Sequence, residues 1–127
     1  MRVSLALLAV VVGCAWLTAP AAEPEPVKPS PAIDFRRDVL PILETKCIRC
    51  HGARERGGKL DLRTRDAMLR GGNTGAAIEV GKPDRSLLVE LIFYNEMPPK
   101  KAKQRVTADE LKVLKAWIEA GAPEAGR

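Results

Sequence analysis

Cys47, Cys50 and His51 are the residues of this chain whose types and spacing could hold a reactive cofactor. Together they form C-x-x-C-H, the pattern to which a c-type haem is attached covalently. Residues three and four apart share one face of a helical turn, so each thiol can form a thioether to one haem vinyl group. His51 could then bring its imidazole to the iron as the proximal ligand. The pattern therefore predicts one haem c, carried by Cys47 and Cys50.

Three other uses of the cysteine pair are open. A thioredoxin-like redox pair should lie near a β–α–β pattern, and the sequence shows no such alternation. A closed zinc site needs two more ligands with similar spacing, but the chain has three cysteines and one histidine, so carboxylates would have to complete it. A structural disulfide between Cys47 and Cys50 suits an oxidising compartment, but it gives His51 no role.

Met97 is the candidate for the distal iron ligand. The sequence contains no second histidine, and Met68 is expected in mid-helix, where methionine usually fills a core. Met97 precedes Pro98 and Pro99, which favour an extended, stiff loop. Such a loop could hold a thioether at the iron with little ordering cost, and a His/Met pair raises the haem potential. The alternative is an ordinary loop or core methionine.

Basic residues near these positions could serve a partner or the cofactor. Four of them follow Met97, namely Lys100, Lys101, Lys103 and Arg105. They could attract an acidic redox protein, or they form a solvated loop. Arg54 and Arg56 could pair with haem propionates, or be solvated in the same way. The net charge is +5, and no aromatic residues interleave a basic cluster as nucleic-acid recognition would require, so we expect no nucleic-acid partner.

The N-terminal 22 residues are typical of an export signal. Arg2 precedes an apolar stretch, residues 5–17, which is too short to span a bilayer. Cleavage near Ala21 would give a freely diffusing protein, whereas Cys14 ends a segment that resembles a bacterial lipobox and could carry a lipid. A proline-rich linker, residues 23–31, follows. We expect an exported protein in the periplasm or cell envelope, in contact with a membrane only if Cys14 is lipidated.

The remaining patterns predict an all-α domain over residues 32–123, with a short tail at 124–127. Helices are expected at residues 33–46, 64–70, 84–93 and 107–120. The first should bend at Pro41, which cannot donate a backbone hydrogen bond. The last should begin with a capping box between Thr107 and Glu110.

Few large side chains are available for the core of this domain. The aromatic residues after the leader are Phe35, Phe93, Tyr94 and Trp117. A chain with so few would build a thin core alone, and a buried haem would supply a large apolar surface. We expect the last helix to pack on the first, with Trp117 near Phe35.

This order of features resembles a class I cytochrome c and, more closely, a planctomycete-type cytochrome c domain. The similar motifs lie at residues 38–43, 47–52, 57–65, 70–72, 81–83, 86–88, 97–99 and 117–122. The resemblance implies a small all-α fold whose helices wrap round one covalent haem. It also implies that Cys47 and Cys50 carry the haem, with His51 as the proximal ligand and Met97 as the distal one.

The expected function is one-electron transfer by an exported mono-haem cytochrome, and not catalysis. Members of the family are commonly one domain of a longer chain, so a chain that stands alone favours a mobile or tethered carrier. The alternative is a haem enzyme or ligand-binding haem protein of peroxidase type, which needs an open sixth iron site. The sequence offers no distal histidine for such a site. A haem-free interaction module is the third hypothesis.

Overall fold

The computed structural model describes residues 32–124. The predicted export signal, Cys14, the proline-rich linker and residues 125–127 lie outside the described residues. Within the described range every regular element is helical, in agreement with the expected all-α class. These elements are η1 (Phe35–Val39), α1 (Leu40–Lys46), η2 (Gly57–Lys59), α2 (Arg65–Arg70), η3 (Pro83–Arg85), α3 (Leu87–Phe93) and α4 (Ala108–Glu119). No helix in this range has the length and apolar character needed to cross a membrane.

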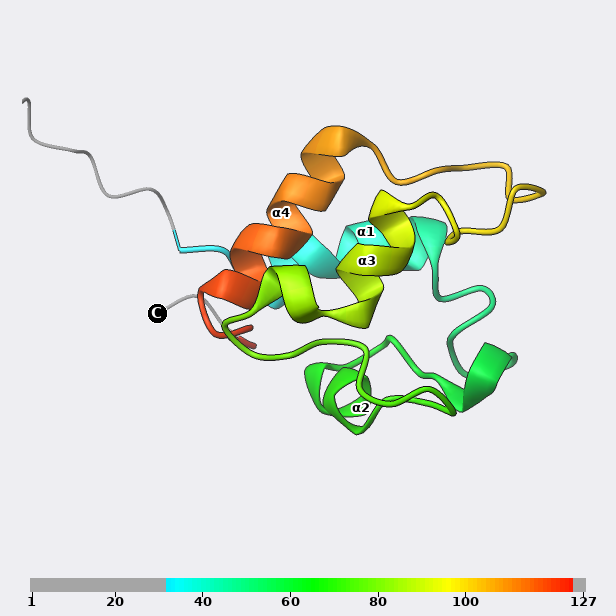
Figure 1. The fold of residues 1–127 in the computed structure, drawn as a ribbon, viewed down its shortest axis with the longest axis horizontal. Coiled ribbons are helices and arrows are strands. Elements are labelled where there is room, and N and C mark those ends of the chain that lie inside the picture. The colour runs from blue at the N-terminus through cyan, green and yellow to red at the C-terminus, as the bar shows by residue number, and fades with distance from the viewer. Residues whose placement is uncertain (1–31, 125–127) are drawn as a thin grey trace, which may run out of the picture.

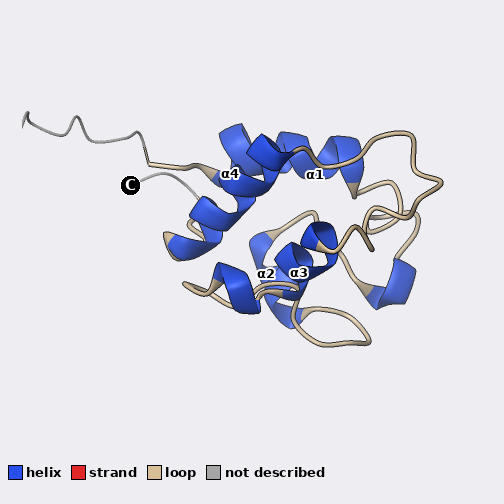
Figure 2. Cartoon of the chain, turned by 45° about the horizontal axis from the view of Figure 1, so that its top comes forward, coloured by secondary structure: helices blue, strands red, loops and turns tan. Residues whose placement is uncertain are grey.

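The helices are short and are joined by long loops (Figure 1). Helix α4 packs against η1, η3 and α3. Helices α4 and α1 lie along one side of the molecule, and α2 lies at the opposite side (Figure 2). The segments between α1 and α2, and between α3 and α4, contain most of the residues predicted to do chemistry.

The expected first helix is divided into η1 and α1. The Leu40 N–H donates to the carbonyl of Phe35, five residues earlier, which makes η1 a single wide π-helical turn. Pro41 then lies in the first turn of α1, where a missing N–H costs little because it would have no partner inside the helix. Where the sequence predicted a bend in one helix, the structure thus has a π-helical turn that passes directly into α1 just before Pro41.

Helix α4 begins with the capping box expected from the sequence. The Thr107 hydroxyl accepts a hydrogen bond from the Glu110 N–H at 3.2 Å, and the Glu110 carboxylate accepts one from the Thr107 N–H at 2.7 Å. The second of these bonds is the main cause that lowers the pKa of Glu110. Two backbone donors that the helix cannot satisfy internally are therefore paired.

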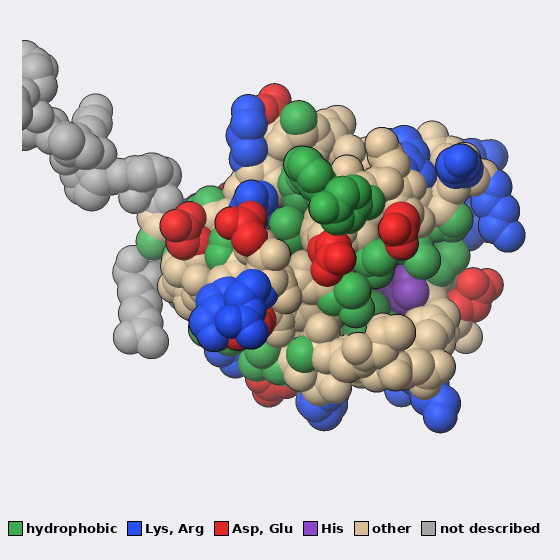
Figure 3. Space-filling view, viewed as in Figure 1, with side chains coloured by type: hydrophobic (Ala, Val, Ile, Leu, Met, Phe, Trp, Pro, Cys, Tyr) green, Lys and Arg blue, Asp and Glu red, His purple; other side chains and the backbone are tan. Residues whose placement is uncertain are grey.

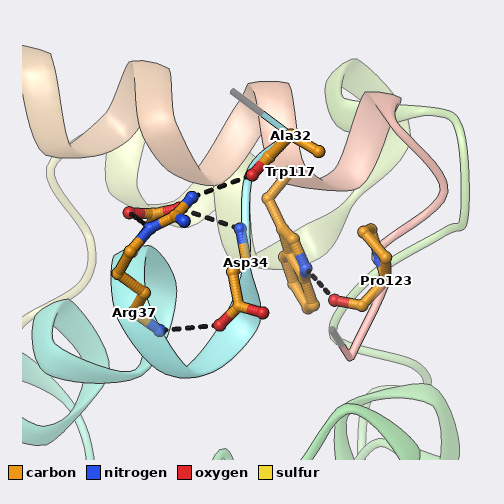
Figure 4. A network of polar contacts seen from close by, with 6 residues as sticks. Ala32, Asp34, Arg37, Trp117 and Pro123 are labelled. Atoms are coloured by element: carbon orange, nitrogen blue, oxygen red, sulfur yellow. Dashed lines mark hydrogen bonds and ion pairs between the residues drawn. The ribbon is translucent and has the colours of Figure 1, made fainter. Parts of the chain in front are cut away.

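The two ends of the described chain meet in the core. The ring centroids of Phe35 and Trp117 are 5.4 Å apart, with the planes inclined at 36°, which confirms the expected packing of α4 on the first helical segment. The buried indole also donates from Nε1 to the Pro123 carbonyl at 2.9 Å (Figure 4). At the N-terminal end of the described chain, the Arg37 side chain donates to the Ala32 carbonyl at 2.8 Å. Apolar packing and satisfied polar groups together hold this end of the molecule.

Helix α3 starts later than the sequence predicts. The expected range began at residue 84, but η3 occupies that position, and Ser86 has extended dihedral angles, so α3 begins at Leu87. The buried Ser86 hydroxyl donates to the Lys82 carbonyl at 2.9 Å and accepts from the Glu79 N–H at 2.9 Å. Serine side chains that bond to the backbone in this way compete with helix formation.

Met68 in α2 is fully buried in the hydrophobic core. The helix is capped as expected, because the Thr64 hydroxyl accepts from the Ala67 N–H at 3.2 Å. The core position confirms the interpretation of Met68 as a packing residue, and it leaves Met97 as the methionine of the described chain with an exposed side chain.

The capping box yields a stability prediction. We expect Thr107→Ala to lower the free energy of unfolding by about 1 kcal/mol, because the Glu110 N–H loses its acceptor. Thr107→Ser keeps a hydroxyl at the cap and should unfold close to the wild type. Chemical denaturation followed by circular dichroism measures both. Equal midpoints for the wild type and Thr107→Ala would contradict the role of the cap.

Candidate cofactor site

The C-x-x-C-H segment forms a turn directly after α1. The Cys47 N–H donates to the Leu43 carbonyl at 2.8 Å, and the Cys47 carbonyl accepts from the N–H groups of Cys50 and His51, each at 3.0 Å. The three side chains are thus carried by one hydrogen-bonded turn. The turn lies outside the regular α-helix, which ends at Lys46, but the bond from the His51 N–H to the Cys47 carbonyl spans four residues, as in one turn of an α-helix.

The two thiols lie in different surroundings. Cys47 is buried and belongs to the hydrophobic core, whereas Cys50 is exposed, and both are free thiols. Burial, followed by the negative charge of Glu110, raises the pKa of the Cys47 thiol to about 11. The structure therefore holds the pair unlinked, in contrast to the disulfide alternative.

The ring of His51 is oriented by a backbone carbonyl. Its Nδ1 lies 3.0 Å from the Gly57 oxygen. A carbonyl can only accept a hydrogen bond, so Nδ1 is the donor and carries a proton. In the neutral ring, Nε2 then keeps its lone pair. Metal-binding histidines are typically oriented in this way, with one nitrogen donating to the protein and the other free for the metal.

The loop between His51 and Gly57 is closed by its own backbone bonds. The Gly52 N–H donates to the Glu55 carbonyl, and the Gly57 N–H donates to the Cys50 carbonyl, both at 2.8 Å. A Cβ added at Gly57 would lie only 3.3 Å from Cε1 of His51. Glycine at this position therefore lets the backbone approach the imidazole closely enough to accept its hydrogen bond.

A second glycine-rich loop packs against this one. The Asn73 N–H donates to the Gly58 carbonyl at 2.7 Å, and a Cβ on Gly72 would lie 2.4 Å from the same oxygen. Glycine at this position therefore allows the two loops to approach each other closely.

These segments border a cleft of about 1060 Å³, slightly above the usual range for small-molecule and cofactor sites. Its apolar lining comes from Leu60, Leu62, Ala77, Leu88, Leu91 and Ile92, among others. Cys47, Cys50, His51 and Met97 all line the same cleft. Figure 3 shows the histidine at the surface beside hydrophobic side chains. The structure thus brings together the four predicted site residues, three of which precede Met97 by about fifty positions in the sequence.

Met97 lies on a loop that folds back onto α3. The N–H groups of Glu96 and Met97 both donate to the Leu91 carbonyl, at 2.8 and 3.0 Å. The Met97 side chain is 38% exposed, so a buried core role does not account for it. A partly exposed thioether in an apolar cleft is available to a ligand bound there.

The basic residues near the cleft do not all have the environment that was expected from the sequence. Lys101 and Lys103 line the cleft, whereas Arg105 is bonded to backbone carbonyls of the Met97 loop. Arg54 and Arg56 are not part of the cleft lining in the described chain, and Arg56 lies 3.7 Å from the Asp61 carboxylate. Of the two roles considered for this arginine pair, the structure therefore gives no support to contact with the propionates of a haem in the cleft.

Two basic residues of the cleft were missed by the sequence analysis. Lys46 and Arg49 line it, on either side of Cys47. Their position next to and inside the C-x-x-C-H motif was the available signal, because any side chain on that turn is close to whatever the cysteines hold.

The described residues give no support to the thioredoxin or zinc alternatives. Across residues 32–124 there is no strand from which a β–α–β unit could be built. The same range contains no group of three or more His, Cys, Asp or Glu side chains placed to hold a metal ion.

Residues 47–101 match the family described as Planctomycete cytochrome C. The match shows that this segment is similar to that family. It confirms the resemblance inferred from the motifs, and the matched range contains Cys47, Cys50, His51 and Met97. A cytochrome c domain implies a c-type haem. Comparisons with curated proteins and with solved structures gave no significant match.

The residues that line the cleft fit a haem c. The lining is largely apolar, as a porphyrin requires, and the turn presents two free thiols next to an imidazole. The Nδ1 of that imidazole is engaged by the protein, which matches the arrangement that a ligating histidine needs.

Asp61 stabilises the segment that returns to His51. Its carboxylate accepts hydrogen bonds from the side chain and the backbone N–H of Arg63. These bonds, the one from the side chain above all, lower the pKa of Asp61 to about 2. The next residue, Leu62, donates from its N–H to the His51 carbonyl at 2.9 Å.

This pKa predicts a loss of stability in acid. The folded-state pKa of about 2 for Asp61 is below the usual value of about 3.9, so its contribution to stability is complete above about pH 5 and is lost as the pH falls through about 2. We expect Asp61→Asn to be less stable than the wild type at pH 7 and to lose less stability between about pH 4 and 2.

Denaturation midpoints of the haem-loaded protein across this pH range provide the measurement. Glu44→Gln, at an exposed position on α1, is the control and should follow the wild type. If the denaturation midpoint of Asp61→Asn fell with pH as that of the wild type does, the Asp61 carboxylate would not contribute to the acid dependence of stability.

Proposed function

We propose that this protein is an exported c-type cytochrome that carries single electrons. In this proposal one haem c is attached through Cys47 and Cys50, with His51 and Met97 as axial ligands and the helices wrapped round the cofactor. The observation that carries the proposal is the cleft itself, because both halves of the ligand set line one apolar space.

The bound haem would supply an iron that gains and loses one electron. The contributions of the chain are separate from that chemistry. The two thiols would retain the cofactor. The Gly57 carbonyl accepts a hydrogen bond from Nδ1 of His51, which leaves the lone pair of Nε2 for the iron. Apolar residues such as Leu88 and Ile92 line the cleft and would exclude water, which tunes the potential of a metal site.

An acidic redox protein is the proposed partner. Lys101 and Lys103 line the cleft and Lys100 is exposed beside them, so positive charge lies next to the Met97 loop. Figure 3 shows basic side chains gathered over the loop that precedes α4. Such charge accelerates the encounter with an acidic surface at low ionic strength. Arg105 is excluded from this surface because its guanidinium is bound to the protein.

The proposed location is the periplasm or cell envelope. It rests on the export signal and on the possible lipid at Cys14, both of which are features of the sequence. A lipid would add a tether to the membrane, and the proline-rich linker would hold the domain away from it.

A haem protein with an open sixth site is the second candidate function. It is favoured by the exposure of Met97, whose side chain is 38% accessible. If the thioether does not reach the iron, the cleft would admit a small ligand or a peroxide. The two functions differ in the coordination of the oxidised iron.

Haem attachment is tested by the intact mass of the exported protein. We expect the mass of one haem in addition to that of the processed chain, and loss of stable attachment when Cys47 and Cys50 are both changed to serine, because no thioether can then form. The same spectrum reports processing at Ala21 or lipidation at Cys14. An exported protein without added mass would instead favour the haem-free module.

Axial ligation is tested by Met97→Ala. We expect the oxidised wild type to show a methionine–iron charge-transfer band and the variant to lose it, since the sulfur is removed. Met68→Leu is the matched control, because it removes the buried methionine with little change in volume, and it should keep the band. If the wild type is already five-coordinate and Met97→Ala leaves the spectrum unchanged, the electron-carrier assignment fails and the open-site candidate is favoured.

A further inference from the structure

Arg105 makes a fork of hydrogen bonds to the loop that carries Met97. One terminal nitrogen, Nη1, donates to the Pro98 carbonyl. The other, Nη2, donates to the Asn95 carbonyl at 3.1 Å and to its side-chain oxygen at 2.8 Å. The two acceptor residues lie on either side of Met97 in sequence, so one guanidinium holds both flanks of the residue.

The backbone of Arg105 is in turn tied to the end of α1. Its carbonyl accepts a hydrogen bond from Nζ of Lys46 at 3.1 Å. The same ammonium lies 3.6 Å from the Glu110 carboxylate, and the Lys46 side chain is only 13% exposed. Lys46 immediately precedes Cys47, so these contacts connect the C-x-x-C-H turn to the Met97 loop.

The Met97 loop has few other attachments in the described chain. On its N-terminal side, backbone bonds tie Glu96 and Met97 to Leu91 of α3. On its C-terminal side, the Pro98 carbonyl is bonded to Arg105. Bonds from a charged donor are stronger than neutral ones, and only arginine offers a planar fork that reaches two acceptors at once. Removal of the guanidinium would delete the hydrogen bonds that tie the Asn95 and Pro98 carbonyls to the segment before α4.

We propose that Arg105 is a positioning residue that keeps the Met97 thioether at the haem iron. It acts through the carbonyls of Asn95 and Pro98 and does not itself touch the cofactor. The proposal rests on the His/Met ligation put forward above. It assigns to Arg105 a role inside the protein, in place of the partner-binding role suggested by its position in a basic run.

The test compares how strongly the Met97 sulfur binds the iron in haem-loaded variants. Imidazole competes with the thioether for the iron, so its apparent affinity rises when the loop is released. We expect Arg105→Gln to bind imidazole about tenfold more tightly than the wild type, because several charged hydrogen bonds are lost. The methionine–iron band should weaken in the same variant. Arg105→Lys, which keeps the charge but not the fork, should change in the same direction by less.

Two controls separate positioning from charge and from general destabilisation. Lys100→Gln removes a neighbouring positive charge at an exposed site and should bind imidazole as the wild type does. Ile118→Val weakens the core of α4, far from the loop in sequence, and should unfold more easily without a change in imidazole affinity.

A milder variant keeps the proposal testable if Arg105→Gln does not mature. Asn95→Gly removes only the side-chain acceptor, and glycine readily adopts the positive φ of 61° found at Asn95. It should raise the imidazole affinity by less than Arg105→Gln.

The outcomes distinguish this proposal from the one on which it rests. A wild type without the methionine–iron band overturns the His/Met ligation and this role of Arg105 together. A wild-type band with unchanged imidazole affinity in Arg105→Gln, or in Asn95→Gly where the former cannot be prepared, overturns the role of Arg105 alone. An equal increase in Lys100→Gln or Ile118→Val would also overturn it, because the effect would then follow charge or stability.

Discussion

The carbonyl oxygen of Gly57 decides which nitrogen of His51 is available. Because this oxygen can only accept, its contact at 3.0 Å fixes the proton on Nδ1 and leaves the lone pair on Nε2. The Gly57 oxygen is held in place by the short loop closed through the Cys50 carbonyl. The rest of the cleft depends on this constraint, since an imidazole with the other tautomer would offer its proton, and not its lone pair, to a metal.

Features predicted correctly from the sequence are those encoded by residues close together in the chain. The capping box at Thr107 needs only a partner three residues later, and the C-x-x-C-H turn needs only five consecutive residues. The contact of Phe35 with Trp117 is an exception, because the two residues are far apart in the sequence. Few large apolar side chains were available to form such a contact. Scarcity of aromatic residues made a long-range contact predictable.

Features missed by the sequence analysis depend on groups that meet only after folding. Ser86 delays the start of α3 because its hydroxyl is bonded to the backbone of Lys82 and Glu79, and nothing in the local sequence indicates these bonds. Arg105 resembles its lysine neighbours in charge, yet two carbonyls lie within reach of its guanidinium. Arg54 and Arg56 follow His51 in sequence but do not line the cleft. Proximity along the chain was a poor guide to the environment of flexible basic side chains.

The contact between Phe35 and Trp117 also has a topological consequence. Every residue that lines the cleft lies between these two positions in the chain, so the aromatic pair joins the two ends of the segment that builds the cleft. Because α4 also packs against η3 and α3, its separation from η1 would loosen the segments that line the cleft. The binding space and the aromatic core therefore belong to the same cooperative unit, and hydrogen exchange in the two regions should proceed through one shared opening.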